Sequence, residues 1–210
     1  MTIVPEKIGQ YLADLHQISD PVIEEMETTA RRRHFPIVGS AVGRLLEISA
    51  RLVNPRNVLE LGSGFGYSAY WLARGMAPGA ALTVTDHDTG NIEACKKNLS
   101  QFSKIFTIHF IQGDALEVLS ASDVELDLVF CDVEKNLYPK VIDPIARRLR
   151  PGGLFLTDNT LWNGRVAEKE VDDTTKAIQV FNRLMMRDAR FQTALLPIRD
   201  GVAMAIRLPD

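Results

Sequence analysis

The chain has 210 residues, of which 46% are hydrophobic and 24% are charged, and its formal net charge is −3. These values are ordinary for one soluble globular domain, and the small negative charge argues against a nucleic acid or an anionic membrane as partner. No apolar run approaches the roughly 20 residues that span a bilayer, and the first residues lack the basic and apolar regions of a signal peptide.

The two cysteines, Cys95 and Cys131, are far apart and form no C-x-x-C pair. They are typical of buried thiols in a reducing compartment, so we expect a cytoplasmic protein and no cysteine-bound zinc.

The N-terminal quarter has helical spacing and little strand pattern. Apolar residues recur at helical intervals over 5–18, 20–33 and 39–53. Asp20 is placed to cap the second of these helices, with Pro21 at its first position. We therefore expect residues 1–55 to form a helical N-terminal extension.

From residue 57, short apolar runs alternate with amphipathic ones. The strand-like runs are 57–61, 81–86, 106–112, 126–132, 153–158, 191–198 and 201–208, and the helical runs are 67–76, 90–102, 114–122, 138–149 and 173–188. This alternation predicts an α/β fold with a mostly parallel seven-stranded sheet and helices on both faces. The last two strands are too close for a crossover helix and should form an antiparallel hairpin. We expect one domain over 1–210, with its core at 56–210.

A glycine-rich loop follows the first predicted strand. In VLELGSGFGYS, residues 58–68, three alternate glycines precede a helix, which is the arrangement that lets a backbone approach a nucleotide-like ligand. The alternative is a tight turn without a ligand.

The spacing of this loop discriminates between ligands. The dinucleotide fingerprint is G-x-G-x-x-G, whereas this loop reads G-x-G-x-G, and Glu60 just before it would repel a pyrophosphate. A carboxylate there suits the ammonium group of S-adenosylmethionine, which has no phosphate. Asp86 ends the next strand where an acid can hold ribose hydroxyls, and His87 follows it. Residues 113–116 lie where the adenine edge would be.

Acid and amide side chains end two later strands. Asp132 ends one strand, and Asp158 and Asn159 end the next. Because carboxyl ends of parallel strands meet at one edge, these side chains should meet near the glycine loop. Two carboxylates and an amide oxygen suit Mg²⁺, Mn²⁺ or Ca²⁺, with Lys135 close enough to share the site. Taken singly, each residue is also explained as a turn former or a helix cap.

These segments resemble a known family. Glu60 to Gly66, with Asp86, is similar to the first motif of class I S-adenosylmethionine-dependent methyltransferases, whose fold is Rossmann-like. FCDVEKNLYP and DNTLWNGRV resemble the cation-dependent O-methyltransferases, the group with catechol and caffeoyl-coenzyme A O-methyltransferases, and the similarity runs from about Gly43 to the closing DGVAMAIRL.

The resemblance implies metal ligands at Asp132, Asp158 and Asn159 and a catalytic lysine at Lys135. The cofactor contacts that we expect from the loop and the resemblance together are Glu60, Gly62, Ser63, Gly64, Gly66, Ser68, Asp86, His87, Asp114, Ala115, Asp132 and Glu134. The family commonly has aspartate at the position of Glu134. Trp162 and Tyr138 are candidates for contact with an aromatic acceptor.

The implied reaction is methyl transfer from S-adenosylmethionine to one hydroxyl of a small aromatic vicinal diol, with a divalent cation on the diol and Lys135 taking the proton. The related enzymes are often dimers, so we expect a homodimer. The alternatives are a metal-independent methyltransferase acting on another small molecule or a nitrogen, a cofactor-binding module without catalysis, and an NAD-dependent dehydrogenase.

Overall fold

One seven-stranded sheet organises residues 3–16, 18–121 and 123–209, which are the residues that the computed structural model describes. Its strand order is β3-β2-β1-β4-β5-β7-β6. The strands are β1 Asn57–Leu61, β2 Ala81–Asp86, β3 Thr107–Gln112, β4 Leu126–Cys131, β5 Leu149–Thr157, β6 Phe191–Leu196 and β7 Val202–Arg207. The first five run parallel, whereas β7 pairs antiparallel with both β5 and β6. The predicted α/β fold and C-terminal hairpin are thereby confirmed.

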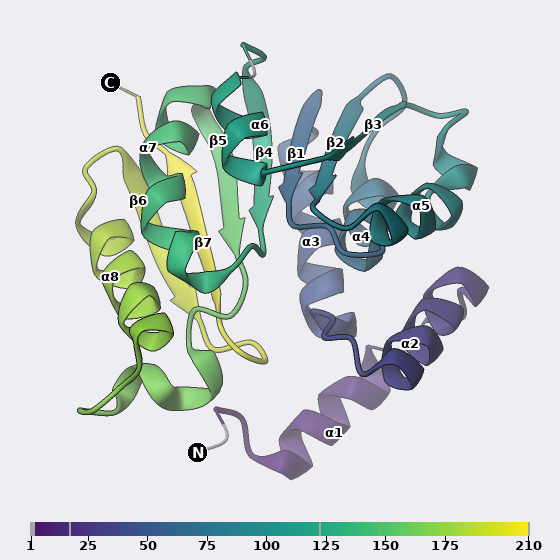
Figure 1. Ribbon diagram of the computed structural model, residues 1–210. Helices are drawn as coiled ribbons and strands as arrows, with labels where there is room; N and C mark the ends of the chain where they lie inside the picture. The colour runs from purple at the N-terminus through teal and green to yellow at the C-terminus, as the bar shows by residue number, and fades with distance from the viewer. Residues whose placement is uncertain (1–2, 17, 122, 210) are drawn as a thin grey trace.

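Helices cover both faces of this sheet (Figure 1). The α-helices are α1 Glu6–Leu15, α2 Pro21–Arg33, α3 Gly39–Val53, α4 Tyr67–Gly75, α5 Thr89–Asn98, α6 Ala115–Ala121, α7 Tyr138–Arg148 and α8 Asp173–Arg187, and the 3-10 helices are η1 Ser100–Phe102, η2 Lys135–Leu137 and η3 Trp162–Ala167. Helices α2 to α5 pack on one face and α6 to α8 on the other.

Alternate strand residues face the two layers. Leu128 and Phe130 of β4 belong to the core beneath α2–α5, whereas Val129 and Cys131 belong to the core beneath α6–α8. Successive side chains of a strand point to opposite faces, so a strand that is apolar at every position must be covered twice. This is why the parallel strands read as continuous apolar runs.

The start of α2 follows the expected capping pattern. The Asp20 carboxylate accepts hydrogen bonds from Val22 N at 3.1 Å and Ile23 N at 3.4 Å, and Pro21 takes the first helical position. Asp20 also accepts a hydrogen bond from the Tyr70 hydroxyl and pairs with Arg74 at 2.7 Å. The cap therefore ties the N-terminal helices to α4, which follows the glycine loop.

The element boundaries differ modestly from the predicted ones. The helix predicted over 5–18 ends at Leu15, and β5 begins at Leu149 rather than at residue 153. The early start of β5 includes an irregular register against β4, with Gly152 at φ +76°. Residues 17 and 122, which belong to two predicted helices, lie outside the described residues, as do 1, 2 and 210. No helix of the described part is both long enough and apolar enough to cross a membrane.

Candidate functional site

The glycine loop joins β1 to α4 and adopts the backbone that its sequence predicts. Gly62, Gly64 and Gly66 all have positive φ, at +84°, +52° and +92°. A Cβ atom on Gly62 would lie 2.4 Å from the carbonyl oxygen of Asp132, and one on Gly66 would lie 2.6 Å from Cys95 Sγ. Glycine is therefore required at both positions by close packing as well as by φ. The Gly62 contact also places the loop directly against Asp132.

Glu60 lies at the base of this loop and is fully buried. Its Oε1 accepts a short hydrogen bond from the Ser68 hydroxyl, whereas its Oε2 is buried without a hydrogen-bond partner. Burial, more than the neighbouring acids Asp132 and Asp86, raises the pKa of the Glu60 carboxyl to about 8. A buried carboxylate with one unsatisfied oxygen is suited to a cationic partner such as an ammonium group.

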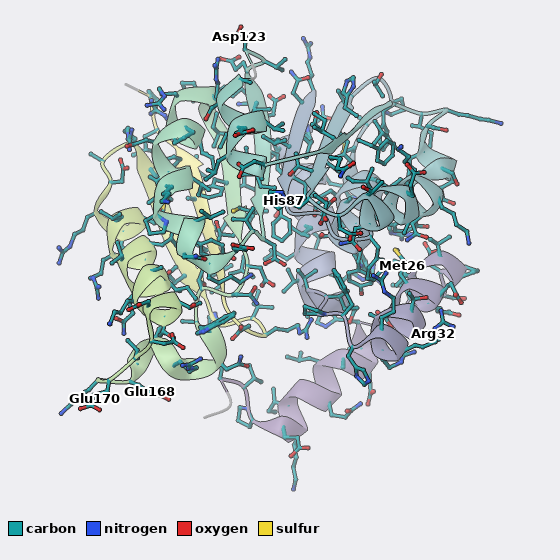
Figure 2. The ribbon with its side chains drawn as sticks, in the orientation of Figure 1. Met26, Arg32, His87, Asp123, Glu168 and Glu170 are labelled. Carbon is teal, nitrogen blue, oxygen red and sulfur yellow. The ribbon has the colours of Figure 1, made fainter. Side chains whose placement is uncertain are left out.

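Asp86 ends β2 beside the loop. Its Oδ2 accepts a hydrogen bond from Gly64 N at 2.9 Å, and its Oδ1 accepts from Asp88 N at 2.8 Å and from the Asn91 amide at 3.2 Å. A carboxylate has about four acceptor sites, so these bonds orient Asp86 without exhausting it. His87, the next residue, is exposed and appears near the centre of Figure 2.

The remaining expected cofactor contacts lie on neighbouring loops. Ser63 is buried within the glycine loop, and Ala115 is buried at the first position of α6. Asp114 accepts hydrogen bonds from Leu116 N at 2.7 Å and Glu117 N at 3.0 Å, which makes it the cap of α6. The Glu134 side chain is exposed at the start of η2.

The ends of β4 and β5 bring two carboxylates together. Cys131 pairs with Thr157 in parallel register, and Asp158 N donates to the Cys131 carbonyl at 3.2 Å. Asp132 and Asp158 thus leave adjacent strands at the same level. Burial and the nearby Asp132 charge raise the pKa of Asp158 to about 7, and Asp158 Oδ1 is buried without a partner.

Asn159 follows Asp158 with φ +57°, a left-handed conformation that asparagine tolerates better than most residues. Its amide Nδ2 donates to Asp200 Oδ2 at 3.2 Å. Asp200 also accepts a short hydrogen bond from Asn163 N, and its carbonyl accepts from Leu161 N at 2.8 Å. The turn between β6 and β7 is thereby fixed against the loop after β5.

Lys135 completes this cluster. Its Nζ lies 2.6 Å from Asp132 Oδ1 and donates to the Val133 carbonyl at 3.2 Å. The same nitrogen lies 5.4 Å from the ring centre of Tyr138 and 5.9 Å from that of Trp162. A partly buried ammonium group is therefore held between one carboxylate and two aromatic rings.

Tyr138 and Trp162 were both expected near an aromatic acceptor. Tyr138 is instead 0% exposed, packs against Phe181 and donates its hydroxyl hydrogen to the Asp158 carbonyl at 2.9 Å. The expectation that its ring faces an acceptor is corrected, because the ring lies in the core. Its hydroxyl bonds to the main chain of the residue that follows β5. Trp162 is half-buried at the start of η3.

The donor set fits a hard divalent cation. Two adjacent carboxylates, one of them with an orphaned buried oxygen, lie beside an amide whose nitrogen is already bonded elsewhere. Oxygen donors of this kind suit Mg²⁺ or Mn²⁺, and a nearby cation would relieve the repulsion between the acids. The described residues contain no group of three or more His, Cys, Asp or Glu side chains that could hold a metal, so Asn159 is needed to make a third ligand.

Comparison with known proteins agrees with this geometry. The model of a family described as O-methyltransferase matches residues 13–208. A caffeoyl-CoA O-methyltransferase of Populus kitakamiensis is 29% identical over 203 residues, covering 89% of this chain and 86% of its own length. A catechol O-methyltransferase of Niastella koreensis is 24% identical, with 96% of each chain covered.

The fold has close counterparts among solved structures. The O-methyltransferase of Bacillus cereus in complex with S-adenosylhomocysteine superposes with a TM-score of 0.83. The two chains are 24% identical, and the match covers 96% of this chain and 97% of the other.

Proposed function

Because the chain belongs to the O-methyltransferase family, and is an S-adenosylmethionine-dependent enzyme of the caffeoyl-CoA and catechol type, we propose that it methylates one hydroxyl of an aromatic vicinal diol with the help of a divalent cation. One observation carries this proposal. The Asp132 main chain packs against Gly62 of the cofactor loop, whereas its side chain lies beside Asp158 and Lys135. The proposed metal ligands are therefore contiguous with the cofactor loop.

S-adenosylmethionine supplies the methyl group, and four features of the chain suit it. The positive-φ glycines leave room for the ligand to approach the backbone. The unpaired oxygen of Glu60 is an acceptor for the ammonium group, and Asp86 keeps acceptor capacity for hydroxyls. Asp114, as the cap of α6, positions the backbone around Ala115.

Asp132, Asp158 and Asn159 would hold the cation, and a divalent cation bound there would favour the ionised form of an acceptor hydroxyl. The unsatisfied Asp158 oxygen supports this assignment. The three residues directly follow β4 and β5, whose ends are paired in the sheet, which supports a shared site for them.

Lys135 would act on the acceptor's proton. Its Nζ is the only basic nitrogen within 4.0 Å of Asp132 or Asp158 in the described part of the chain. Lys135 must first release its own extra proton to solvent, and the neutral amine can then take the proton of an acceptor hydroxyl oriented beside Asp132. The oxygen would then form a bond to the methyl carbon as the carbon–sulfur bond of S-adenosylmethionine breaks, and S-adenosylhomocysteine would leave. Much of the acceleration would come from holding the two reactants in line.

A metal-dependence assay with a panel of catechols tests this proposal. Methylation of a simple catechol should require Mg²⁺ or Mn²⁺, stop on addition of EDTA and return when the metal is restored in excess. Turnover that persists at full rate in EDTA would favour the metal-independent alternative. Cofactor binding without turnover of any acceptor would favour the binding module.

Two further expectations belong to this proposal. Cys95 and Cys131 are both buried and free, which supports a reducing, cytoplasmic setting. The helix α1 has no buried residue and exposes the apolar side chains Ile8, Tyr11 and Leu15, which supports homodimer formation through this helix.

A further inference from the structure

Arg199 occupies the turn between β6 and β7, directly before Asp200. Its φ is +50°, in the left-handed region that side-chain-bearing residues seldom adopt. From this turn the side chain reaches the loop between α2 and α3, where Nη1 donates to the Ile37 carbonyl at 2.8 Å. Arg199 thereby bridges the β6–β7 turn, whose Asp200 bonds to Asn159, and the loop that enters α3.

The guanidinium of Arg199 packs directly against Gly39. Gly39 has φ +72°, and a Cβ atom there would lie 2.1 Å from Arg199 Nη1 and 2.8 Å from Cζ. The missing side chain at position 39 is what makes room for the arginine. One hydrogen bond anchors the group in this space.

The charge of Arg199 is not neutralised within the described residues. No carboxylate of that part of the chain lies within 4.0 Å of its nitrogens. The two oxygens of the neighbouring Asp200 instead accept hydrogen bonds from Asn159 and Asn163. A guanidinium has five N–H donors, so most of them remain for a ligand.

This charge lies near the proposed metal site, because Arg199 directly precedes Asp200, whose carboxylate accepts a hydrogen bond from Asn159. Among its electrostatic effects, it lowers the pKa of Asp158 and of Tyr67, against the larger raising effect of burial on both groups. Asp158 is a proposed metal ligand, and Tyr67 begins α4 beside the glycine loop. Arg199 therefore connects the α2–α3 loop to the turn that bonds to the proposed metal ligand Asn159.

We propose that Arg199 binds a carboxylate carried by the acceptor, so that the enzyme prefers acidic catechols over their neutral counterparts. This inference rests on the proposed function, because it concerns the acceptor of that reaction. The diol would be oriented at Asp132, Asp158 and Asn159, and the acceptor's carboxylate would point toward Arg199. A planar, bidentate donor is the side chain best matched to a carboxylate.

The experiment compares two acids with their methyl esters as acceptors: 3,4-dihydroxybenzoate and 3-(3,4-dihydroxyphenyl)propanoate. For the wild-type enzyme, we expect kcat/KM to be about 10-fold higher for at least one acid than for its ester, as a charge-assisted hydrogen bond provides. Arg199→Gln should reduce this ratio to about 1, and Arg199→Lys should retain part of it.

Arg187→Gln is the matched control. Arg187 is exposed at the end of α8 and its loss changes the net charge equally. This variant should keep the wild-type ratio, whereas a general field effect would lower it in both glutamine variants and would overturn the assignment. A wild-type ratio of 1 for both acids would also overturn it.

Two further outcomes contradict the inference. Equal losses for acid and ester in Arg199→Gln would mean that Arg199 only braces the α2–α3 loop. A 10-fold rise in KM for S-adenosylmethionine with an unchanged acid-to-ester ratio would assign Arg199 to the cofactor's carboxylate.

Calorimetry gives the ratio of acid affinity to ester affinity without turnover, when the same acids and esters bind to the protein saturated with S-adenosylhomocysteine and Mg²⁺. Failure of every catechol to react would then count against the proposed function, and a binding ratio of 1 against Arg199.

Discussion

The carboxylate of Asp200 accepts a hydrogen bond from the Asn159 side-chain amide, with 3.2 Å between Oδ2 and Nδ2, although 41 positions separate the two residues. An asparagine amide has one acceptor oxygen and one donor nitrogen. Engaging the nitrogen leaves the oxygen for another partner. Asp200 therefore fixes which end of Asn159 is presented to the proposed cation.

Replacing Asp200 with alanine should weaken metal binding without removing a ligand. The Asn159 amide would lose its orienting partner, and the Asn163 amide N–H would lose its acceptor. Residues that hydrogen-bond to metal ligands commonly contribute 10–100-fold to metal affinity. We expect Asp200→Ala to lower the affinity for Mn²⁺ about 10-fold, measured by electron paramagnetic resonance. Asp173→Ala, at a position where the side chain is 98% exposed, removes the same charge and should leave Mn²⁺ affinity unchanged.

Three aspartates, Asp132, Asp158 and Asp200, show what the sequence predicts and what it does not. Asp132 and Asp158 are predictable, because apolar strands that end in acids must deliver them to one edge of a parallel sheet. Asp200 is not, since its role depends on β7 inserting between β5 and β6, which places the hairpin turn over Asn159. The only hint is the Asp-Gly pair at that turn, which reads equally well as ordinary hairpin chemistry.

The burial of Tyr138 is not predictable from the sequence for a related reason. An aromatic residue shortly after a proposed catalytic lysine suggests a pocket, but spacing along the chain does not tell which side of a helix faces the site. Tyr138 begins α7, and its ring points into the core beneath α6–α8. The burial raises the pKa of its hydroxyl well above the ordinary value, so it remains a donor to the Asp158 carbonyl.

Substitution of Lys135 by methionine should separate chemistry from binding. Methionine has a similar length and would keep the packing against Trp162 and Tyr138, but it cannot take a proton. General-base catalysis typically contributes 10²–10⁴-fold, so kcat should fall by at least about 100-fold. The Kd for S-adenosylmethionine, measured by calorimetry, should stay within about threefold. Comparable losses in kcat and cofactor affinity would show instead that Lys135 maintains the site's structure.

Gly62 should be far less tolerant of alanine than Gly79. Both have φ near +85°, so each substitution imposes the same left-handed strain of about 1 kcal/mol. A Cβ atom at Gly62 would additionally press on the Asp132 carbonyl at 2.4 Å, whereas one at Gly79 meets nothing within 4 Å. We expect Gly62→Ala to lower the melting temperature more and to impair both cofactor and metal binding. Equal effects of the two variants on ligand binding would contradict direct contact between the cofactor loop and the metal end of β4.

Glu60 should make the ligand-free protein less stable as the pH rises. In the unfolded chain a glutamate ionises near pH 4.5, whereas in the folded chain burial raises the pKa of Glu60 to about 8. Between these values the folded chain keeps a proton that the unfolded chain has released, so raising the pH favours unfolding. The Glu60 contribution to the free energy of unfolding should fall by on the order of 5 kcal/mol across this window.

The Glu60→Gln variant isolates this effect on stability and also tests whether the carboxylate contributes to cofactor binding. Glutamine keeps an acceptor for the Ser68 hydroxyl but cannot ionise, so urea unfolding should show near wild-type stability at pH 5 and greater stability at pH 9. Parallel pH profiles for the two proteins would contradict the buried, proton-holding carboxyl. Because the variant also loses the negative charge opposite an ammonium group, its affinity for S-adenosylmethionine should fall by about 10-fold or more. A residue that destabilises the empty protein yet is needed for the cofactor is what a binding site, rather than a packing position, requires.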